Sequence, residues 1–186
     1  MNPHLILFTL TAALATPTAY AVEYRAVVPQ QSAIQFEFRQ MGVPVKGGFK
    51  RFATQMRFDP AKPEAASAQV EIDLASIDAG SMEADEESAS KLWFNRSVYP
   101  KAIFTASQVR ALGNNSYEMR GTLTLKGKSR PMVVPVTYSP GKNLAIFDGA
   151  FILKRLEFGI GEGMWADVAT VANEVKVSFR IAASGK

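Results

Sequence analysis

The chain is dominated by an alternation of apolar and polar residues with a period of two. The alternation is clearest in five segments, namely residues 34–38, 52–58, 70–74, 117–125 and 171–181. Successive side chains of a β-strand point to opposite faces, so each segment predicts a strand with one buried face and one hydrated face. Antiparallel sheets show this pattern, whereas parallel sheets are buried on both faces. The pattern therefore predicts an all-β, antiparallel fold.

Residues that favour turns separate these segments. Residues 113–115 and 126–128 contain Gly and Asn or Lys between apolar runs and predict hairpins. Pro135 cannot donate a backbone hydrogen bond, so it predicts that its strand is an edge strand or is bulged. Gly47 and Gly48 indicate a bulge or bend. About eight short strands at regular spacing favour a sandwich or a closed barrel, and such a barrel either packs its interior or holds one small ligand.

One segment, residues 81–93, breaks the alternation. It is rich in helix-forming residues, Ser81 is a good N-cap, and acidic residues come first with Lys91 near the end, as the helix dipole prefers. We expect one helix here, packed near the mouth of the barrel. The acidic run Glu83–Glu87 is expected to form a hydrated face.

The first 21 residues have the features of a secretory signal peptide. An apolar run, Leu5–Leu14, is followed by the small-x-small sequence Ala19-Tyr20-Ala21, and the run is too short to span a bilayer. We expect cleavage after Ala21, leaving residues 22–186 as a single exported domain.

The composition restricts the chemistry of that domain. The chain has no cysteine, and its one histidine, His4, lies in the expected signal peptide. We therefore expect no metal site and no Ser-His or Cys-His catalysis. The net charge is +4, but basic residues alternate with acidic ones, so we expect no nucleic-acid partner. Glu71 and Asp73 share a strand face, yet the apolar residues between them claim the interior, which places both carboxylates in water.

Seven short motifs occur in order along residues 32–160. They are SxIxF at 32–36, VKGGF at 45–49, FDP at 58–60, VEID followed by ASI at 70–77, LWFN followed by YPxxxF at 92–104, GTLTLKG at 121–127, and RLEFGI at 155–160. Together they resemble the YceI-like family of exported, polyisoprenoid-binding, lipocalin-like proteins. Many members of that family have a histidine just after the first Phe-rich strand, where this chain has Gln40, which cannot titrate.

The resemblance implies a lipocalin-like barrel that holds an isoprenoid lipid, a quinone or a polyprenyl type, and no other cofactor. It also implies a periplasmic binding and transport protein, not an enzyme, that is a monomer or homodimer and makes transient contact with the inner membrane or a membrane protein. Two alternatives remain open at this stage. One is an interaction module with a filled barrel, and the other is a hydrolase of lipids or glycans that uses Asp or Glu.

The expected ligand-binding residues are the inward apolar positions, the bulky residues after the helix, and a few polar groups at the mouth. They are Phe36, Phe38, Gln40, Val43, Phe49, Phe58, Ile72, Leu74, Leu92, Trp93, Phe94, Leu123, Phe151, Leu153, Arg155, Trp165 and Phe179. The segment Leu92-Trp93-Phe94 either plugs the barrel or forms its mouth. Arg155 either forms an ion pair, with Asp85, Glu87 or Asp167 as partner, or anchors a headgroup.

Overall fold

A computed structural model describes residues 23–141 and 144–185 of the chain. The expected signal peptide and its cleavage site lie outside the described residues. The strands are β1 (Tyr24–Val27), β2 (Ala33–Gln40), β3 (Val43–Phe49), β4 (Phe52–Arg57), β5 (Ser67–Asp73), β6 (Ile77–Asp78), β7 (Lys101–Gly113), β8 (Ser116–Leu125), β9 (Lys128–Ser139), β10 (Leu144–Lys154) and β11 (Glu174–Gly185). The helices are α1 (Met82–Ala89) and the 3-10 helices η1 (Pro29–Gln31), η2 (Pro63–Ala65), η3 (Leu74–Ser76), η4 (Arg155–Phe158) and η5 (Gly163–Ala166).

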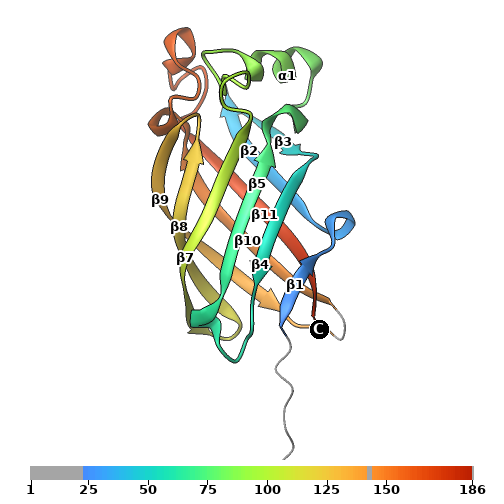
Figure 1. Cartoon of the computed structure of the whole chain (residues 1–186). Helices are drawn as coiled ribbons and strands as arrows, with labels where there is room; N and C mark the ends of the chain where they lie inside the picture. Colours follow the sequence, from blue (N-terminus) through green and yellow to red (C-terminus); the bar gives the residue numbers. More distant parts are fainter. Residues whose placement is uncertain (1–22, 142–143, 186) are drawn as a thin grey trace, which may run out of the picture.

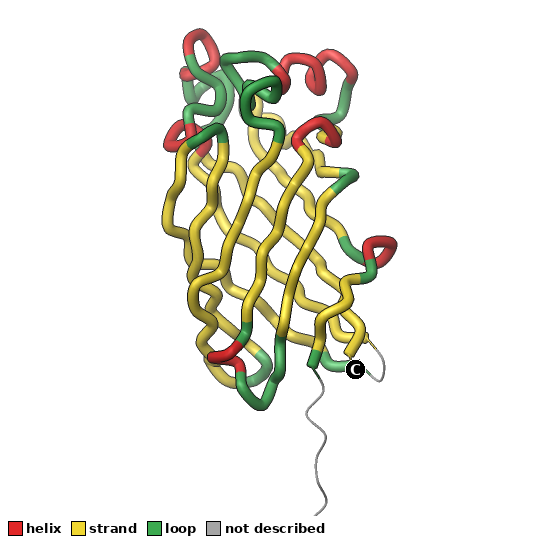
Figure 2. Tube along the Cα trace, in the orientation of Figure 1, coloured by secondary structure: helices red, strands yellow, loops and turns green. Residues whose placement is uncertain are grey.

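The strands form one antiparallel sheet that curls into a barrel (Figures 1 and 2). Along the sheet the order is β4-β5-β7-β8-β9-β10-β11-β2-β3-β6, and β1 also pairs with β11. The ends of this order meet because β3 and β4 follow one another down the same side, β3 pairing with β6 and β4 with β5. A bridge between Tyr24 and Phe58 then joins β1 to the end of β4.

The described segments occupy eight positions around the barrel because three long strands are each interrupted once. β1 and β2 both lie against β11 and are separated by η1, and β5 and β6 are separated by η3. β3 and β4 are separated at Lys50 and Arg51, where the Lys50 amide donates to the Ser76 carbonyl at 3.0 Å. The predicted antiparallel barrel of about eight strands is therefore confirmed, with interruptions that the alternation did not reveal.

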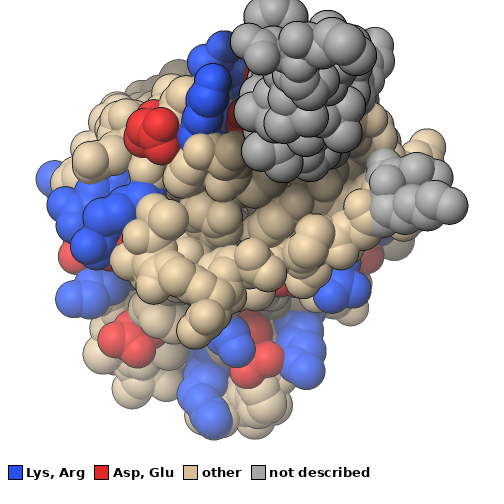
Figure 3. All heavy atoms as spheres, turned by 90° about the horizontal axis from the view of Figure 1, so that it is seen from below, with Lys and Arg blue, Asp and Glu red and all other residues tan. Residues whose placement is uncertain are grey.

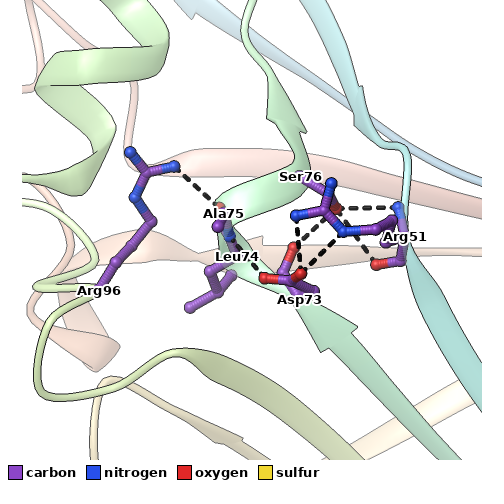
Figure 4. Close-up of polar contacts among 6 residues, drawn as sticks. All are labelled: Arg51, Asp73, Leu74, Ala75, Ser76 and Arg96. Carbon is purple, nitrogen blue, oxygen red and sulfur yellow. Dashed lines mark hydrogen bonds and ion pairs between the residues drawn. The ribbon is translucent and has the colours of Figure 1, made fainter.

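A small polar cluster fixes the interruption of β5 (Figure 4). The Asp73 carboxylate accepts from the Ala75 amide at 2.9 Å, which caps η3, and also from Arg51 Nε at 2.9 Å. The Ser76 hydroxyl donates to the Asp73 carbonyl at 2.7 Å and accepts from the Arg51 amide at 2.9 Å. The Ala75 amide, and then Arg51, hold the pKa of Asp73 below its ordinary value. Both long strands thus bend at the same place, where they face each other.

The two predicted hairpins are present, and the φ angles of their turn residues explain why Asn and Gly occur there. Asn114 and Asn115, between β7 and β8, have φ values of 49° and 57°. Lys126 and Gly127, between β8 and β9, have φ values of 48° and 72°. Positive φ at both central residues matches the right-handed twist of the flanking strands.

The first part of β9 is an edge, as Pro135 predicted. Its ladder with β10 ends at the pair Val136–Gly149, whereas its ladder with β8 continues to Lys128. The amide of Tyr138 donates on the β8 side, so the nitrogen of Pro135, three residues earlier, faces β10. A proline at this position removes the backbone N–H that the ladder with β10 would have used.

Helix α1 lies at the upper end of the barrel, with η4 and η5 beside it, as Figure 1 shows. Ser81 caps α1 as predicted, its hydroxyl accepting from the Ala84 amide at 3.2 Å. The helix ends at Ala89, so the predicted extent to residue 93 is wrong. The Phe94 amide returns to the Ser88 carbonyl at 3.0 Å, which turns the chain away from the helix axis.

The outer surface carries paired charges of both signs. Arg180 holds Asp148 on the neighbouring strand with two hydrogen bonds of 2.8 and 3.1 Å, and Lys101 holds Glu71 at 2.7 Å. On the face seen from below, basic and acidic side chains are interspersed over the visible atoms (Figure 3). Such exposed pairs add little to stability. Across residues 23–141 and 144–185, no helix is long and apolar enough to cross a membrane.

Candidate binding cavity

The lower end of the barrel is closed by packed aromatic rings. Phe58 contacts Tyr117 and Phe147 edge-to-face at centroid distances of 5.2 and 5.1 Å. The Tyr138 hydroxyl meets the Tyr24 hydroxyl at 3.2 Å, and all five side chains are buried. Burial, followed by the contact with Tyr24, raises the pKa of Tyr138 above its ordinary value. These rings come from β1, β8, β9, β10 and the end of β4, so they also hold the closure of the sheet.

Above this plug the interior is hollow. A lower cavity of about 140 Å³ and an upper cavity of about 610 Å³ lie one above the other. The same side chains line both where they meet, namely Ile72, Ala102, Leu123, Phe151 and Val177. The interaction-module alternative requires a filled barrel, which these cavities contradict.

Fifteen of the seventeen expected ligand-binding residues line a cavity. Those in the upper cavity are Phe36, Phe38, Gln40, Phe49, Ile72, Leu74, Trp93, Phe94, Leu123, Phe151, Leu153, Arg155 and Trp165. Phe58 and Phe179 line the lower one, together with Ile72, Leu123 and Phe151. Most of the side chains that the period-two alternation placed inward therefore line a cavity.

The structure places the other two, Val43 and Leu92, outside the cavities. Val43 pairs with Gln40 at the turn of the β2–β3 hairpin, beyond the barrel mouth, and is 62% exposed. Leu92 is 37% exposed, and its carbonyl accepts from the amides of Gly161 and Glu162, each at 2.9 Å. Leu92 therefore joins the segment of α1 to the segment of η4 and η5, which together form the cap of the barrel, and it lines neither cavity.

Sequence reasoning missed the contribution of α1. Glu83, Ala84, Glu87 and Ser88 line the upper cavity, whereas the acidic run was expected to form a hydrated face. Their spacing did contain the signal, because residues four apart in a helix share a face. The pair 83 and 87 and the pair 84 and 88 form one face, and the position of the helix over the mouth turns that face inward.

Arg155 organises the cap instead of forming an ion pair. Its side chain is 1% exposed, and burial lowers its pKa. Its five N–H groups donate to the carbonyls of Ala172 (3.0 Å), Ile160 (2.8 Å), Gly161 (2.9 Å), Trp165 (2.7 Å) and Val171 (2.6 Å). No carboxylate pairs with Arg155 among the described residues, so the expected ion pair is wrong. Since every donor is used, the alternative of a headgroup anchor is not supported either.

Two tryptophans complete the cap. Trp165 donates its indole N–H to the Glu87 carboxylate at 3.0 Å, which ties η5 to α1. The Trp93 and Trp165 rings contact each other at 5.7 Å, and the Arg155 guanidinium lies 5.8 Å from the centre of the Trp93 ring. Trp93 thus lines the upper cavity on the side where the cap covers it.

The pKa shifts of the acidic residues give no support to the hydrolase alternative. The hydrolase alternative needs a carboxylate whose pKa is strongly raised inside the cavity. Hydrogen bonds from its own amide and from Ser81 instead lower the pKa of Glu83. Lys101 lowers the pKa of Glu71, which lies on the outer surface. No three Asp, Glu, His or Cys side chains gather into a metal-binding group in the part of the chain that the structure describes.

Comparison with known proteins gives consistent matches. Residues 26–183 match the model of the YceI-like domain. A UPF0312 protein of Pseudomonas savastanoi pv. phaseolicola is 32% identical over 158 residues, covering 81% of this chain and 82% of that one. The crystal structure of Burkholderia cenocepacia BcnA is 40% identical in sequence and has a TM-score of 0.82. The match covers 84% of this chain and 98% of that one. A domain from Saccharophagus degradans, described as polyisoprenoid-binding, shares the fold with a TM-score of 0.67 and 15% identity, covering 90% of this chain and 100% of that one.

Proposed function

Because this chain belongs to the YceI-like family, we propose that it binds one long isoprenoid lipid inside its barrel. The observation that supports this most strongly is the upper cavity of about 610 Å³, which is lined mainly by apolar side chains and capped by polar ones. This volume lies within the usual range for small-molecule sites, about 300 to 1,000 Å³. The polyisoprenoid binding described for the Saccharophagus degradans domain, which has the same fold, also supports the proposal.

The apolar lining provides the binding energy. Each methylene group that leaves water for such a surface contributes about 0.8 kcal/mol. The tail would run downward past Phe151 and toward the lower cavity, while the headgroup would remain beneath α1 at the polar end. Binding and release require no covalent step.

We further propose that the protein carries its lipid through the periplasm. The apolar leader with its small-x-small cleavage sequence supports export. A carrier must shield its cargo from water and release it at a membrane. The hydrogen bond between Trp165 and Glu87 links η5 to α1, and its loss would help the cap to open.

A pair of matched variants tests the binding proposal. Ala102 is buried and lines both cavities, whereas Ala111 on the same strand is exposed. We expect delipidated Ala102→Phe to lose most of its affinity for geranylgeraniol because the new ring fills the interior. Ala111→Phe should bind like the unmodified protein. Titration calorimetry gives the affinities, and circular dichroism confirms that both variants are folded. Equal binding by all three proteins would place the lipid outside the barrel and refute the proposal.

A further inference from the structure

Large apolar side chains are exposed mainly at the upper end of the barrel. Within residues 23–141 and 144–185 ten of them are exposed, and seven belong to the β2–β3 turn, to residues 82–98 or to residues 164–168. Figure 1 shows α1 and the short helices η4 and η5 at that end. Single exposed apolar residues are ordinary, whereas a group of them indicates an interaction site. Five of the seven, each 56 to 77% exposed, are named the apolar rim here: Met41, Val43, Met82, Met164 and Val168.

The turn between β2 and β3 has a residue that its backbone does not favour. Gln40 pairs with Val43, which leaves Met41 and Gly42 as a two-residue loop. Their φ values are 51° and 81°, and loops of this kind prefer Asn, Asp or Gly at both positions. Met41 is also 75% exposed, so packing within the chain does not explain it. An unfavoured and exposed methionine at a hairpin tip indicates a contact outside the chain.

Backbone contacts hold the parts of the apolar rim next to one another. The Met41 amide donates to the Thr170 carbonyl at 2.9 Å, which places the β2–β3 turn beside the loop that contains Val168. Met164 belongs to η5 and Met82 is the first residue of α1, and the indole hydrogen bond described above ties these two helices together. The rim therefore lies on the elements whose separation would open the cap.

The charges around the rim restrict its partner. Residues 79–98 and 161–171 contain six acidic and two basic residues, and Glu83, Glu86 and Asp167 are exposed. Exposed carboxylates repel an anionic lipid surface, but they can approach the ammonium group of a zwitterionic phospholipid such as phosphatidylethanolamine. A second copy of the chain docked through the same surface would bring like charges together. The acidic surroundings and the apolar rim thus fit a zwitterionic lipid surface best.

From these observations we propose that the apolar rim docks on the surface of a zwitterionic phospholipid bilayer. The side chains of the rim enter the headgroup region, and the cap then opens toward the membrane that supplies or receives the lipid. This inference rests on the proposed lipid-carrying function and adds the surface through which the carrier meets its membrane. It does not depend on which isoprenoid the barrel holds.

Two matched variants test the docking surface. Met41→Asn removes an apolar side chain from the rim and introduces a residue that the turn prefers, so the variant should be at least as stable in thermal unfolding. Leu112→Asn makes the same kind of change beside the β7–β8 turn, where Leu112 is 52% exposed. We expect Met41→Asn to cosediment about tenfold more weakly with vesicles of phosphatidylcholine and phosphatidylethanolamine, the effect of losing one buried apolar side chain. Leu112→Asn should bind like the unmodified protein.

Lipid charge and salt distinguish this contact from attraction by basic residues elsewhere on the barrel. Replacing part of the phosphatidylethanolamine by phosphatidylglycerol should not tighten binding, and added salt should not weaken it. The inference is overturned if Met41→Asn binds the vesicles as tightly as the unmodified protein, or if phosphatidylglycerol tightens binding and salt reverses the gain. It is also overturned if light scattering shows a dimer that Met41→Asn dissociates, because the rim would then join two copies.

Binding of an isoprenoid in the absence of vesicles separates this inference from the proposed function. Met41 lines neither cavity, so Met41→Asn should bind geranylgeraniol as tightly as the unmodified protein in calorimetry. Its transfer of a fluorescent isoprenoid to the vesicles should be about tenfold slower. If the unmodified protein binds geranylgeraniol but not the vesicles, the docking inference alone is refuted. If neither protein binds geranylgeraniol, the proposed function is refuted.

Discussion

The guanidinium group of Arg155 donates hydrogen bonds to five backbone carbonyls in separate parts of the cap. Two belong to the loop after η4, one belongs to η5, and two belong to the segment that leads into β11. Loop carbonyls of this kind would otherwise have to bond to water. The planar arrangement of five donors suits this role, which lysine cannot fill with three.

Substitution of Arg155 should therefore destabilise the protein strongly. We expect Arg155→Ala to lower the free energy of unfolding by about 3 kcal/mol or more, because several buried carbonyls lose their donors. Arg155→Lys should be intermediate. Urea unfolding followed by circular dichroism measures both. Variants as stable as the unmodified protein would show that the cap carbonyls find other partners.

Ionisation of Tyr138 makes the stability of the fold fall at alkaline pH. Burial and the contact with Tyr24 raise its pKa in the folded state, whereas in the unfolded chain it titrates near the ordinary value of about 10. The folded state therefore holds this proton more tightly. The contribution to stability is complete below pH about 10 and is lost as pH rises above it.

Comparison with Tyr138→Phe isolates this effect from that of other groups that titrate at high pH. We expect the urea midpoint of the unmodified protein to fall more steeply than that of the variant between pH about 9 and about 11. Parallel curves for the two proteins would mean that Tyr138 ionises in the folded state as easily as in the unfolded one.

Among the elements, α1 and η5 are the parts of the cap that we expect to separate when a lipid enters or leaves. The link between them is the hydrogen bond of 3.0 Å from Trp165 to Glu87. Glu86, the preceding residue, is exposed and does not line the cavity. The two glutamates thus offer a variant and a control on one helix.

Loss of this link should speed lipid release without abolishing binding. We expect Glu87→Ala to raise the dissociation rate of a bound isoprenoid about tenfold, the effect of losing one hydrogen bond to a charged group, and Glu86→Ala to leave the rate unchanged. Stopped-flow transfer of a fluorescent isoprenoid to vesicles measures the rate. If both variants release lipid at the original rate, the cap does not control exchange.

The elements that sequence reasoning predicted correctly are those determined by nearby residues. The hairpin turns need positive φ at Asn114 and Asn115, and the start of α1 needs Ser81 three residues before the amide that it caps. The break between β3 and β4 depends instead on Ser76, which lies 25 residues from Arg51. The sequence around residue 51 alone contains no sign of that contact.

The same distinction applies to the site. The alternation identified Phe36 and Phe38 as inward residues, because side-chain direction is a local property of a strand. It could not show that the interior is hollow, since the width of a barrel depends on the number and tilt of all its strands. The expectation of a ligand came from the family resemblance. The partners of Arg155 could not be predicted, because they come from loops that only the folded cap brings together.

At the scale of the whole molecule, the two ends of the barrel differ in character. The lower end is sealed by buried aromatic rings, and the upper end is closed by short helices and loops that hydrogen bonds of Leu92, Arg155 and Trp165 join. The cavities between them are lined mainly by apolar side chains. Under the proposed function, this asymmetry favours entry and exit of the lipid at the upper end, with the tail toward the lower end of the barrel.

The most direct test of a lipid-filled barrel is mass spectrometry of an organic extract from the purified, folded protein. The account predicts that the extract contains an isoprenoid lipid in about a one-to-one ratio to protein. The absence of any isoprenoid, both in the purified protein and after incubation with bacterial membrane extract, would contradict it.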